Sequence, residues 1–199
     1  MNYYLGGING VGKSTFLQEL AKQEPDVKIY HGSKLLMAGL GIVPDDYDTL
    51  RQVPSKNKDI AYGAVVIKQL GEHRDAGEIV VFDSHYLGLI EGKVVKATGN
   101  WLKKFDCLLL LEAPTDEVLG RVLRDEVARD RKLFPAGMEI AGKRKLLGDY
   151  ADWTKKEFLS LAQEYGLGSH ILLNQNNEIE SSVKKFIELH NLLVSKQQC

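Results

Sequence analysis

Cysteine is scarce in this sequence. Among 199 residues there are only Cys107, inside an apolar run, and Cys199, at the last position. Two cysteines cannot build a disulfide framework or a four-ligand zinc site, and this low usage suits a reducing compartment. We interpret Cys107 as a small buried hydrophobic residue rather than a reactive thiol.

An excess of charge of either sign is also missing. The chain has 26 Lys and Arg against 27 Asp and Glu, for a formal net charge of -1, so no overall positive field attracts a nucleic-acid backbone or an anionic membrane. There is no run of 18 or more apolar residues, and no basic N-terminal region followed by a long apolar stretch. We expect a cytoplasmic protein that binds neither membranes nor nucleic acid.

Short apolar runs alternate with helical patterns along the whole chain. A length of 199 residues fits one domain, residues 1–199, with one core. Continuous apolar runs separated by helices are typical of buried parallel strands with helices on both faces of the sheet. The expected strands are residues 3–5, 27–30, 79–82, 107–111 and 171–173. The expected helices are residues 14–23, 34–40, 58–74, 116–131, 138–165 and 178–193.

Two segments fit no simple strand or helix. They are residues 41–54 and residues 84–100, the second of which contains Gly88, Gly92 and Gly99. Long connections in a compact domain are often functional. We expect residues 84–99, which follow the third strand, to form part of an acceptor pocket.

A glycine-rich loop directly follows the first expected strand. Residues 7–14 match the pattern G-x-x-x-x-G-K-[ST], in which closely curled backbone N–H groups and a helix N-terminus cradle phosphates. Lys13 should reach the β- and γ-phosphates, and the Ser14 hydroxyl should ligate Mg²⁺. The expected ATP-binding residues of the loop are Gly7, Asn9, Gly10, Val11, Gly12, Lys13, Ser14 and Thr15. The fold class is therefore expected to be α/β, a P-loop NTPase three-layer sandwich around a five-stranded parallel sheet.

An aspartate ends the third expected strand. Asp83 follows four apolar residues and can support Mg²⁺ through water, opposite the phosphate loop. Alone the feature is weak, since an Asp at a strand end often caps the next turn.

Arginines gather in one part of the chain. Four of the seven arginines, at positions 121, 124, 129 and 131, lie within eleven residues, and guanidinium groups match the oxygens of a transferring phosphoryl group. On a helix, Arg121, Arg124 and Arg131 can share one face. The alternative is a solvated helix whose arginines pair with neighbouring acidic side chains such as Glu117.

Two classes of nucleotide-binding protein fit poorly. The chain contains neither the Asn-Lys-x-Asp guanine-reading motif nor the Asp-x-x-Gly switch of a GTPase. A translocating motor or chaperone ATPase needs more chain than 199 residues. A small kinase fits the size better.

With these motifs in place, the sequence resembles the nucleoside monophosphate kinases, and most closely the archaeal-type adenylate kinases. The phosphate loop carries most of the resemblance. Further matching segments are His31-Gly32-Ser33, Leu50-Arg51-Gln52-Val53-Pro54, Val81-Phe82-Asp83-Ser84-His85, the arginine-rich region 121–131, and residues 173–177. The chain differs from the family at Asn9, where the family usually has Pro, and at residues 86–99, which cannot be matched.

The resemblance implies roles on the acceptor side. Ser33 and Arg51 would hold the acceptor monophosphate, and His85 would lie near it, within an acceptor-binding insertion of about residues 31–75 and the strand end beside it. Ser33 could instead cap a helix that begins near Lys34, Arg51 could be a surface charge, and His85 could be a structural hydrogen-bonding residue.

It also implies roles on the donor side. Arg121 would flank the donor adenine, while Arg129 and Arg131 would close on the transferring phosphate from a lid of about residues 121–137. Asn174 and Asn176 would contact the donor base, although this loop could be an ordinary turn before the last helix. Together with Lys13 and Asp83, the three arginines are the expected catalytic residues.

The expected reaction is Mg-ATP-dependent transfer of a phosphoryl group to a nucleoside monophosphate, with AMP giving two ADP. The identity of the acceptor base stays open. The alternatives are a P-loop kinase for another nucleotide or a small metabolite, and an ATP-dependent assembly factor. The resemblance also allows a homotrimer.

Overall fold

Five parallel strands form the central sheet of the computed structural model, which describes residues 1–73, 78–129, 133–175 and 178–197. The strand order is β2-β3-β1-β6-β7, and every neighbouring pair is parallel. The strands are β1 (Asn2–Gly6), β2 (Lys28–His31), β3 (Val80–Asp83), β6 (Cys107–Glu112) and β7 (Gly168–Leu173). All five strands expected from the apolar runs are therefore confirmed.

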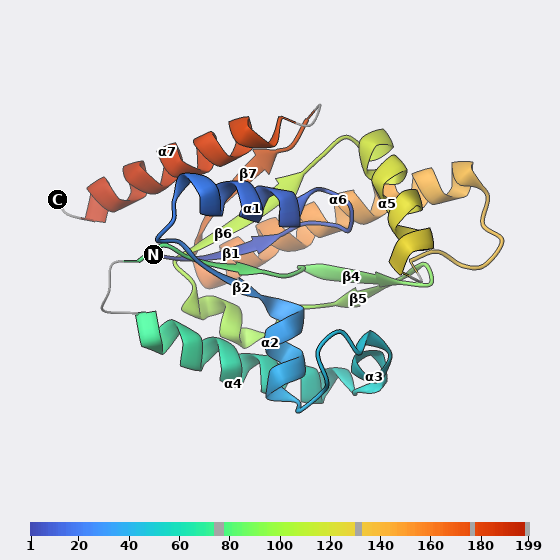
Figure 1. Cartoon of the computed structure of the whole chain (residues 1–199), viewed down its shortest axis with the longest axis horizontal. Helices are drawn as coiled ribbons and strands as arrows, with labels where there is room; N and C mark the ends of the chain where they lie inside the picture. The colour runs from blue at the N-terminus through green and yellow to red at the C-terminus, as the bar shows by residue number, and fades with distance from the viewer. Residues whose placement is uncertain (74–77, 130–132, 176–177, 198–199) are drawn as a thin grey trace.

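Helices cover both faces of this sheet, which gives the expected three layers (Figure 1). They are α1 (Lys13–Gln23), α2 (Gly32–Gly39), α3 (Tyr47–Gln52), α4 (Ser55–His73), α5 (Thr115–Arg129), α6 (Ile140–Tyr165) and α7 (Ile179–Gln197). Helices α1 and α7 lie along one face and α4 along the other. No helix within the described ranges is long and apolar enough to cross a membrane.

The core is divided by the sheet, because the central strands are buried on both faces. In β1, Tyr3 and Leu5 pack into the cluster that includes Phe16 of α1 and Phe186 of α7. Tyr4 points the other way, into the cluster built by α4 and the C-terminal half of α6. Successive strand side chains alternate between faces, so a run of apolar residues is what a strand between two helical layers requires.

Both segments without an assigned element contain regular structure. Residues 41–54 include the short helix α3, and residues 84–100 fold as the hairpin β4 (Leu87–Ile90) and β5 (Lys93–Lys96), followed by the 3₁₀ helix η1 (Asn100–Lys104). The two central turn residues, Glu91 and Gly92, have φ values of 47° and 78°, which is the conformation of a tight two-residue hairpin turn.

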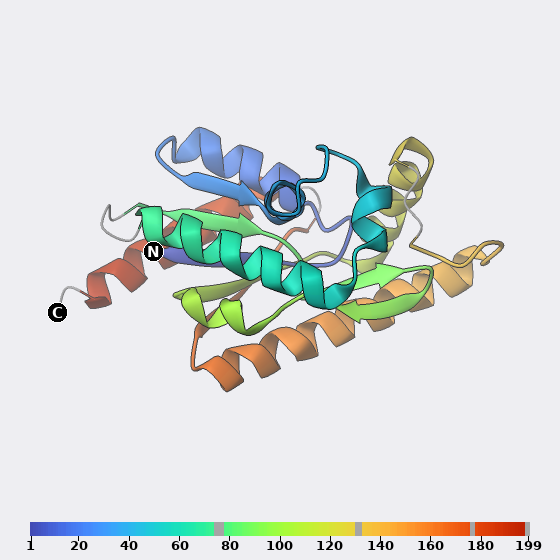
Figure 2. The ribbon, with the colours of Figure 1, turned by 90° about the horizontal axis from the view of Figure 1, so that it is seen from below.

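The hairpin packs against α6 and against the segment that follows α5 (Figure 2). Tyr150 of α6 donates to the carbonyl oxygen of Leu87 at 2.6 Å, and Lys96 lies 3.4 Å from Glu157. At the tip, the Gly92 N–H donates to the carbonyl oxygen of Leu133 at 2.8 Å. These contacts tie the hairpin to the end of the expected lid, and the expected place of residues 84–99 in an acceptor pocket stays a prediction.

Candidate active site

The phosphate loop connects β1 to α1, and three glycines shape it. Gly7, Gly10 and Gly12 all have positive φ, and Gly12, at 96°, is the N-cap of α1. A Cβ at position 12 would lie 2.4 Å from the amide nitrogen of Asn174. Only glycine meets both demands. The loop therefore ends on a helix N-terminus, whose free N–H groups favour an anion.

Lys13, the first residue of α1, folds back over this loop. Its Nζ atom donates to the carbonyl oxygens of Gly7 at 2.9 Å and Ile8 at 3.4 Å. These contacts hold a partly buried ammonium group beside the loop, within reach of a phosphate bound there. Ser14 and Thr15 follow in the first turn of α1, both exposed.

Asp83 lies at the carboxyl end of β3, beside the phosphate loop. It pairs in register with Leu5 of β1 and with His31 of β2, and Nδ1 of His31 lies 3.3 Å from its Oδ2 atom. Burial alone would raise the pKa of Asp83, but the His31 hydrogen bond and the nearby Lys13 and His85 lower it below its usual value. The carboxylate is therefore ionised at neutral pH.

The other oxygen of the Asp83 carboxylate is available to the expected metal. Asp83 Oδ1 is buried and has no hydrogen-bond partner within the described part of the chain, although buried acceptors are nearly always satisfied. A hydrated Mg²⁺ would satisfy it through water, and the Ser14 hydroxyl supplies a second hard oxygen ligand. The residues present fit Mg²⁺ in the expected way.

His85 contacts the phosphate loop itself. Its Nδ1 atom lies 2.9 Å from the carbonyl oxygen of Gly7, the same oxygen that accepts from Lys13. The observed contact is thus with the loop backbone, which is the structural alternative considered above.

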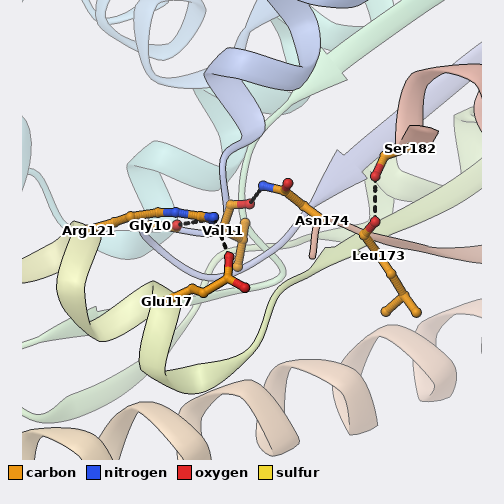
Figure 3. A network of polar contacts seen from close by, with 7 residues as sticks. All are labelled: Gly10, Val11, Glu117, Arg121, Leu173, Asn174 and Ser182. Carbon is orange, nitrogen blue, oxygen red and sulfur yellow. Dashed lines mark hydrogen bonds and ion pairs between the residues drawn. The ribbon is translucent and has the colours of Figure 1, made fainter. Parts of the chain in front are cut away.

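Arg121 of α5 reaches the loop (Figure 3). One guanidinium nitrogen donates to the Gly10 carbonyl oxygen at 3.3 Å, and the other lies 2.6 Å from Glu117, one turn earlier. Arg124 is exposed. Arg129 is the last residue of α5, but its side chain, like the whole of Arg131, lies outside the described residues, so the expected shared face is described only for Arg121 and Arg124.

Asn174 reaches the loop from the opposite side, where β7 ends (Figure 3). Its side chain is buried, and Nδ2 donates to the carbonyl oxygen of Val11 at 2.7 Å. Asn176 lies outside the described residues.

Ser33 and Arg51, the residues expected to hold the acceptor phosphate, lie on the segment between β2 and β3. Ser33 is the second residue of α2, which begins at Gly32 and has His31 as its N-cap, so Ser33 does not cap a helix beginning near Lys34. Arg51, in α3, forms an ion pair with Asp48 at 2.5 Å, which is the contact expected of the surface-charge alternative.

His31 was not singled out by the sequence reasoning. Ligand sites in open parallel sheets lie at the carboxyl ends of the strands, and His31 ends β2. Its position after an apolar run was therefore the signal that could have identified it.

Phosphate loop, parallel sheet and helical layers together define a P-loop kinase-type nucleotide-binding fold. A family model described as an AAA domain matches residues 6–133, which is most of the chain. The protein belongs to this AAA domain family.

Solved structures of kinases share the fold. A shikimate kinase from Bacteroides thetaiotaomicron is similar at a TM-score of 0.56 and 16% identity, covering 96% of this chain and 98% of that one. The Acinetobacter baumannii shikimate kinase in complex with shikimate gives 0.56 and 17%, covering 98% and 94%. A sugar kinase from Janibacter sp. HTCC2649 gives 0.54 and 14%, covering 94% and 92%. No curated protein matches the sequence.

Proposed function

We propose that this protein transfers the γ-phosphoryl group of Mg-ATP to a nucleoside monophosphate, with AMP as the acceptor and two ADP as products. The observation that carries the proposal is the convergence of Lys13, Asp83 and Arg121 on one phosphate loop from three different elements. Cations and an ionised carboxylate around such a loop are the parts that phosphoryl transfer needs.

Each residue has a distinct part in the transfer. Lys13 exchanges its carbonyl contacts for the β- and γ-phosphates, and the loop N–H groups bind the remaining phosphate oxygens. Ser14 and, through water, Asp83 would hold Mg²⁺, which when bound neutralises phosphate charge. No protein nucleophile is needed, because positioning and charge stabilisation supply the catalysis.

The acceptor and the lid complete the site. Ser33 and Arg51 bind the acceptor phosphate, with His85 nearby, and Arg51 must leave Asp48 to do so. Arg129 and Arg131 close on the transferring group and exclude water. The cytoplasmic location remains part of the same proposal, and the resemblance allows a homotrimer.

A second candidate acceptor is a small metabolite with a hydroxyl group. It is favoured by the named kinases of similar fold, one of which was solved in complex with shikimate. An ATP-dependent assembly factor is the alternative outside the kinases, and it would hydrolyse ATP without an acceptor.

The test is ADP formation from Mg-ATP with AMP, CMP, UMP, GMP, dTMP, shikimate or no acceptor, beside Lys13→Ala. The proposal predicts strong stimulation by AMP that the variant lacks. Stimulation by shikimate alone would identify the metabolite kinase. Slow hydrolysis of ATP at a rate that no acceptor changes would overturn the kinase proposal and favour the assembly factor.

A further inference from the structure

Two consecutive carbonyl groups of the phosphate loop are held from outside it. The Gly10 carbonyl accepts from Arg121 of α5, and the Val11 carbonyl accepts from Asn174 after β7, as Figure 3 shows. We propose that Asn174 is a positioning residue that orients the loop for phosphate and does not read the donor base. The inference rests on the proposed binding of Mg-ATP by this loop.

Peptide geometry links the Val11 carbonyl to phosphate binding. In a trans peptide the C=O and the following N–H point in opposite directions. A Val11 carbonyl directed outward to Asn174 therefore turns the Gly12 N–H away from Asn174. This N–H group belongs to the run that cradles phosphate.

The side-chain amide of Asn174 has a fixed orientation toward the Val11 carbonyl oxygen. Asn174 is 3% exposed, and its Nδ2 atom donates to the Val11 oxygen at 2.7 Å. The opposite orientation of the amide would place two acceptor oxygens against each other, so the donor must face the loop.

The remaining oxygen of the amide strengthens the argument. Asn174 Oδ1 is buried without a hydrogen-bond partner in the described ranges, and an unsatisfied buried acceptor destabilises a protein. An apolar side chain would avoid that cost. The hydrogen bond from Asn174 Nδ2 to the Val11 carbonyl oxygen explains why a polar residue occupies this position.

The backbone around Asn174 is fixed on both sides. The Asn174 N–H donates to the Glu112 carbonyl oxygen of β6 at 2.8 Å. The hydroxyl of Ser182, a fully buried residue of α7, donates to the Leu173 carbonyl oxygen at 2.5 Å. The sheet and α7 therefore fix the backbone at Leu173 and Asn174. The Asn174 side chain in turn holds the loop in a fixed position.

The test compares two ligands that share phosphates but not a base. Affinities for Mg-ATP and for Mg-tripolyphosphate are measured by calorimetric titration for wild type, Asn174→Ala and Asn174→Asp. A positioning role predicts that both affinities fall by the same factor, about tenfold for the loss of one buried hydrogen bond. Asn174→Asp should fall at least as far, because an ionised carboxylate cannot donate to the Val11 carbonyl.

The matched control is Ser195→Ala, which removes the hydrogen bond from the Ser195 hydroxyl to the Leu192 carbonyl oxygen near the C-terminal end of α7 and leaves the support of Asn174 intact. It should keep both affinities even where its unfolding temperature falls. If Asn174→Ala does not fold, Asn174→Ser keeps a polar group in the site and gives the same comparison.

The outcomes separate the possibilities. A loss of affinity for Mg-ATP alone would mean that Asn174 reads the base, and unchanged affinities for both ligands would mean that the loop does not need it; either result overturns the inference. If the wild-type protein bound neither ligand, the proposed function itself would fail.

Discussion

At the residue scale, the predicted acceptor-binding arginine is held by an exposed ion pair. Arg51 pairs with Asp48 on the same helix, and the Arg51 and Asp48 side chains are 35% and 78% exposed. Exposed ion pairs of this kind contribute little stability. Arg51 can therefore leave its partner for an acceptor phosphate at small cost.

Arg51→Ala should raise KM for the acceptor by about tenfold, because a charge-assisted contact to phosphate is lost. The value of kcat should change much less. Steady-state kinetics with varied acceptor at saturating ATP measure both constants. Arg144→Ala is the matched control, since Arg144 forms an exposed pair with Asp116 at 2.6 Å. An unchanged acceptor KM would remove Arg51 from the site.

His190 gives the protein a dependence of stability on pH. Its Nδ1 atom lies 2.8 Å from the Tyr3 hydroxyl, and burial and the N-terminal ammonium lower its pKa below the ordinary 6.5. Below that pH the unfolded chain binds the proton more readily than the folded one, so stability falls as pH falls toward the folded pKa.

His190→Gln should therefore reduce the drop in unfolding temperature between pH 7.5 and pH 5.5. Thermal unfolding of both proteins at the two pH values measures this difference. An equal drop in the variant would mean that His190 does not supply the dependence.

Single residues could be predicted from the sequence where a motif fixed their neighbours. Lys13 belongs to a contiguous pattern, and it lies on the loop as expected. The His31 contact with Asp83 spans 52 residues and depends on the pairing of β2 with β3. Sequence spacing alone cannot specify such a partner.

For Cys107, burial raises the pKa of the thiol to about 12, in agreement with its interpretation as an unreactive core residue.

At the element scale, the β4–β5 hairpin supports the end of the expected lid. Its tip bonds to Leu133, and a Cβ on Gly92 would lie 3.0 Å from Pro135. The hairpin was missed because Gly88 weakens the strand pattern of β4 and because β5 has only two apolar residues between two lysines. The six-residue helix α3 was missed because it is too short to show a helical apolar period. Longer elements with a strong apolar period were predicted with small errors at their ends.

Gly92→Ala should lower both stability and kcat, and leave the KM for ATP nearly unchanged. Its φ of 78° is strained for alanine by about 1 kcal/mol, and the new methyl group presses on Pro135. Thermal unfolding and steady-state kinetics measure the two effects.

The matched control is Gly166→Ala. Gly166 has a φ of 64° with no atom within 4 Å of an added Cβ. The Gly166→Ala variant therefore has the backbone strain without a steric clash, and it should keep kcat. A kcat for Gly92→Ala equal to that of this control would show that the hairpin does not influence the lid.

At the scale of the whole molecule, the sheet brings distant segments to one edge. Strand β1 lies between β3 and β6. The phosphate loop after β1 and Asp83 at the end of β3 therefore lie close together, although they are some seventy residues apart in sequence. The class of fold was predictable, because buried parallel strands and the loop motif agree with each other. The order of the strands was not, since it depends on which helix covers which face.

The central claim is that the γ-phosphoryl group passes to a nucleotide acceptor. The most direct measurement follows γ-labelled Mg-ATP with unlabelled AMP in wild type, Lys13→Ala and Lys22→Ala, the last a control whose side chain is 73% exposed. The account predicts labelled ADP from wild type and Lys22→Ala, and a loss on the order of a hundredfold or more in Lys13→Ala. Label released only as inorganic phosphate, at a rate that AMP does not alter, would contradict it.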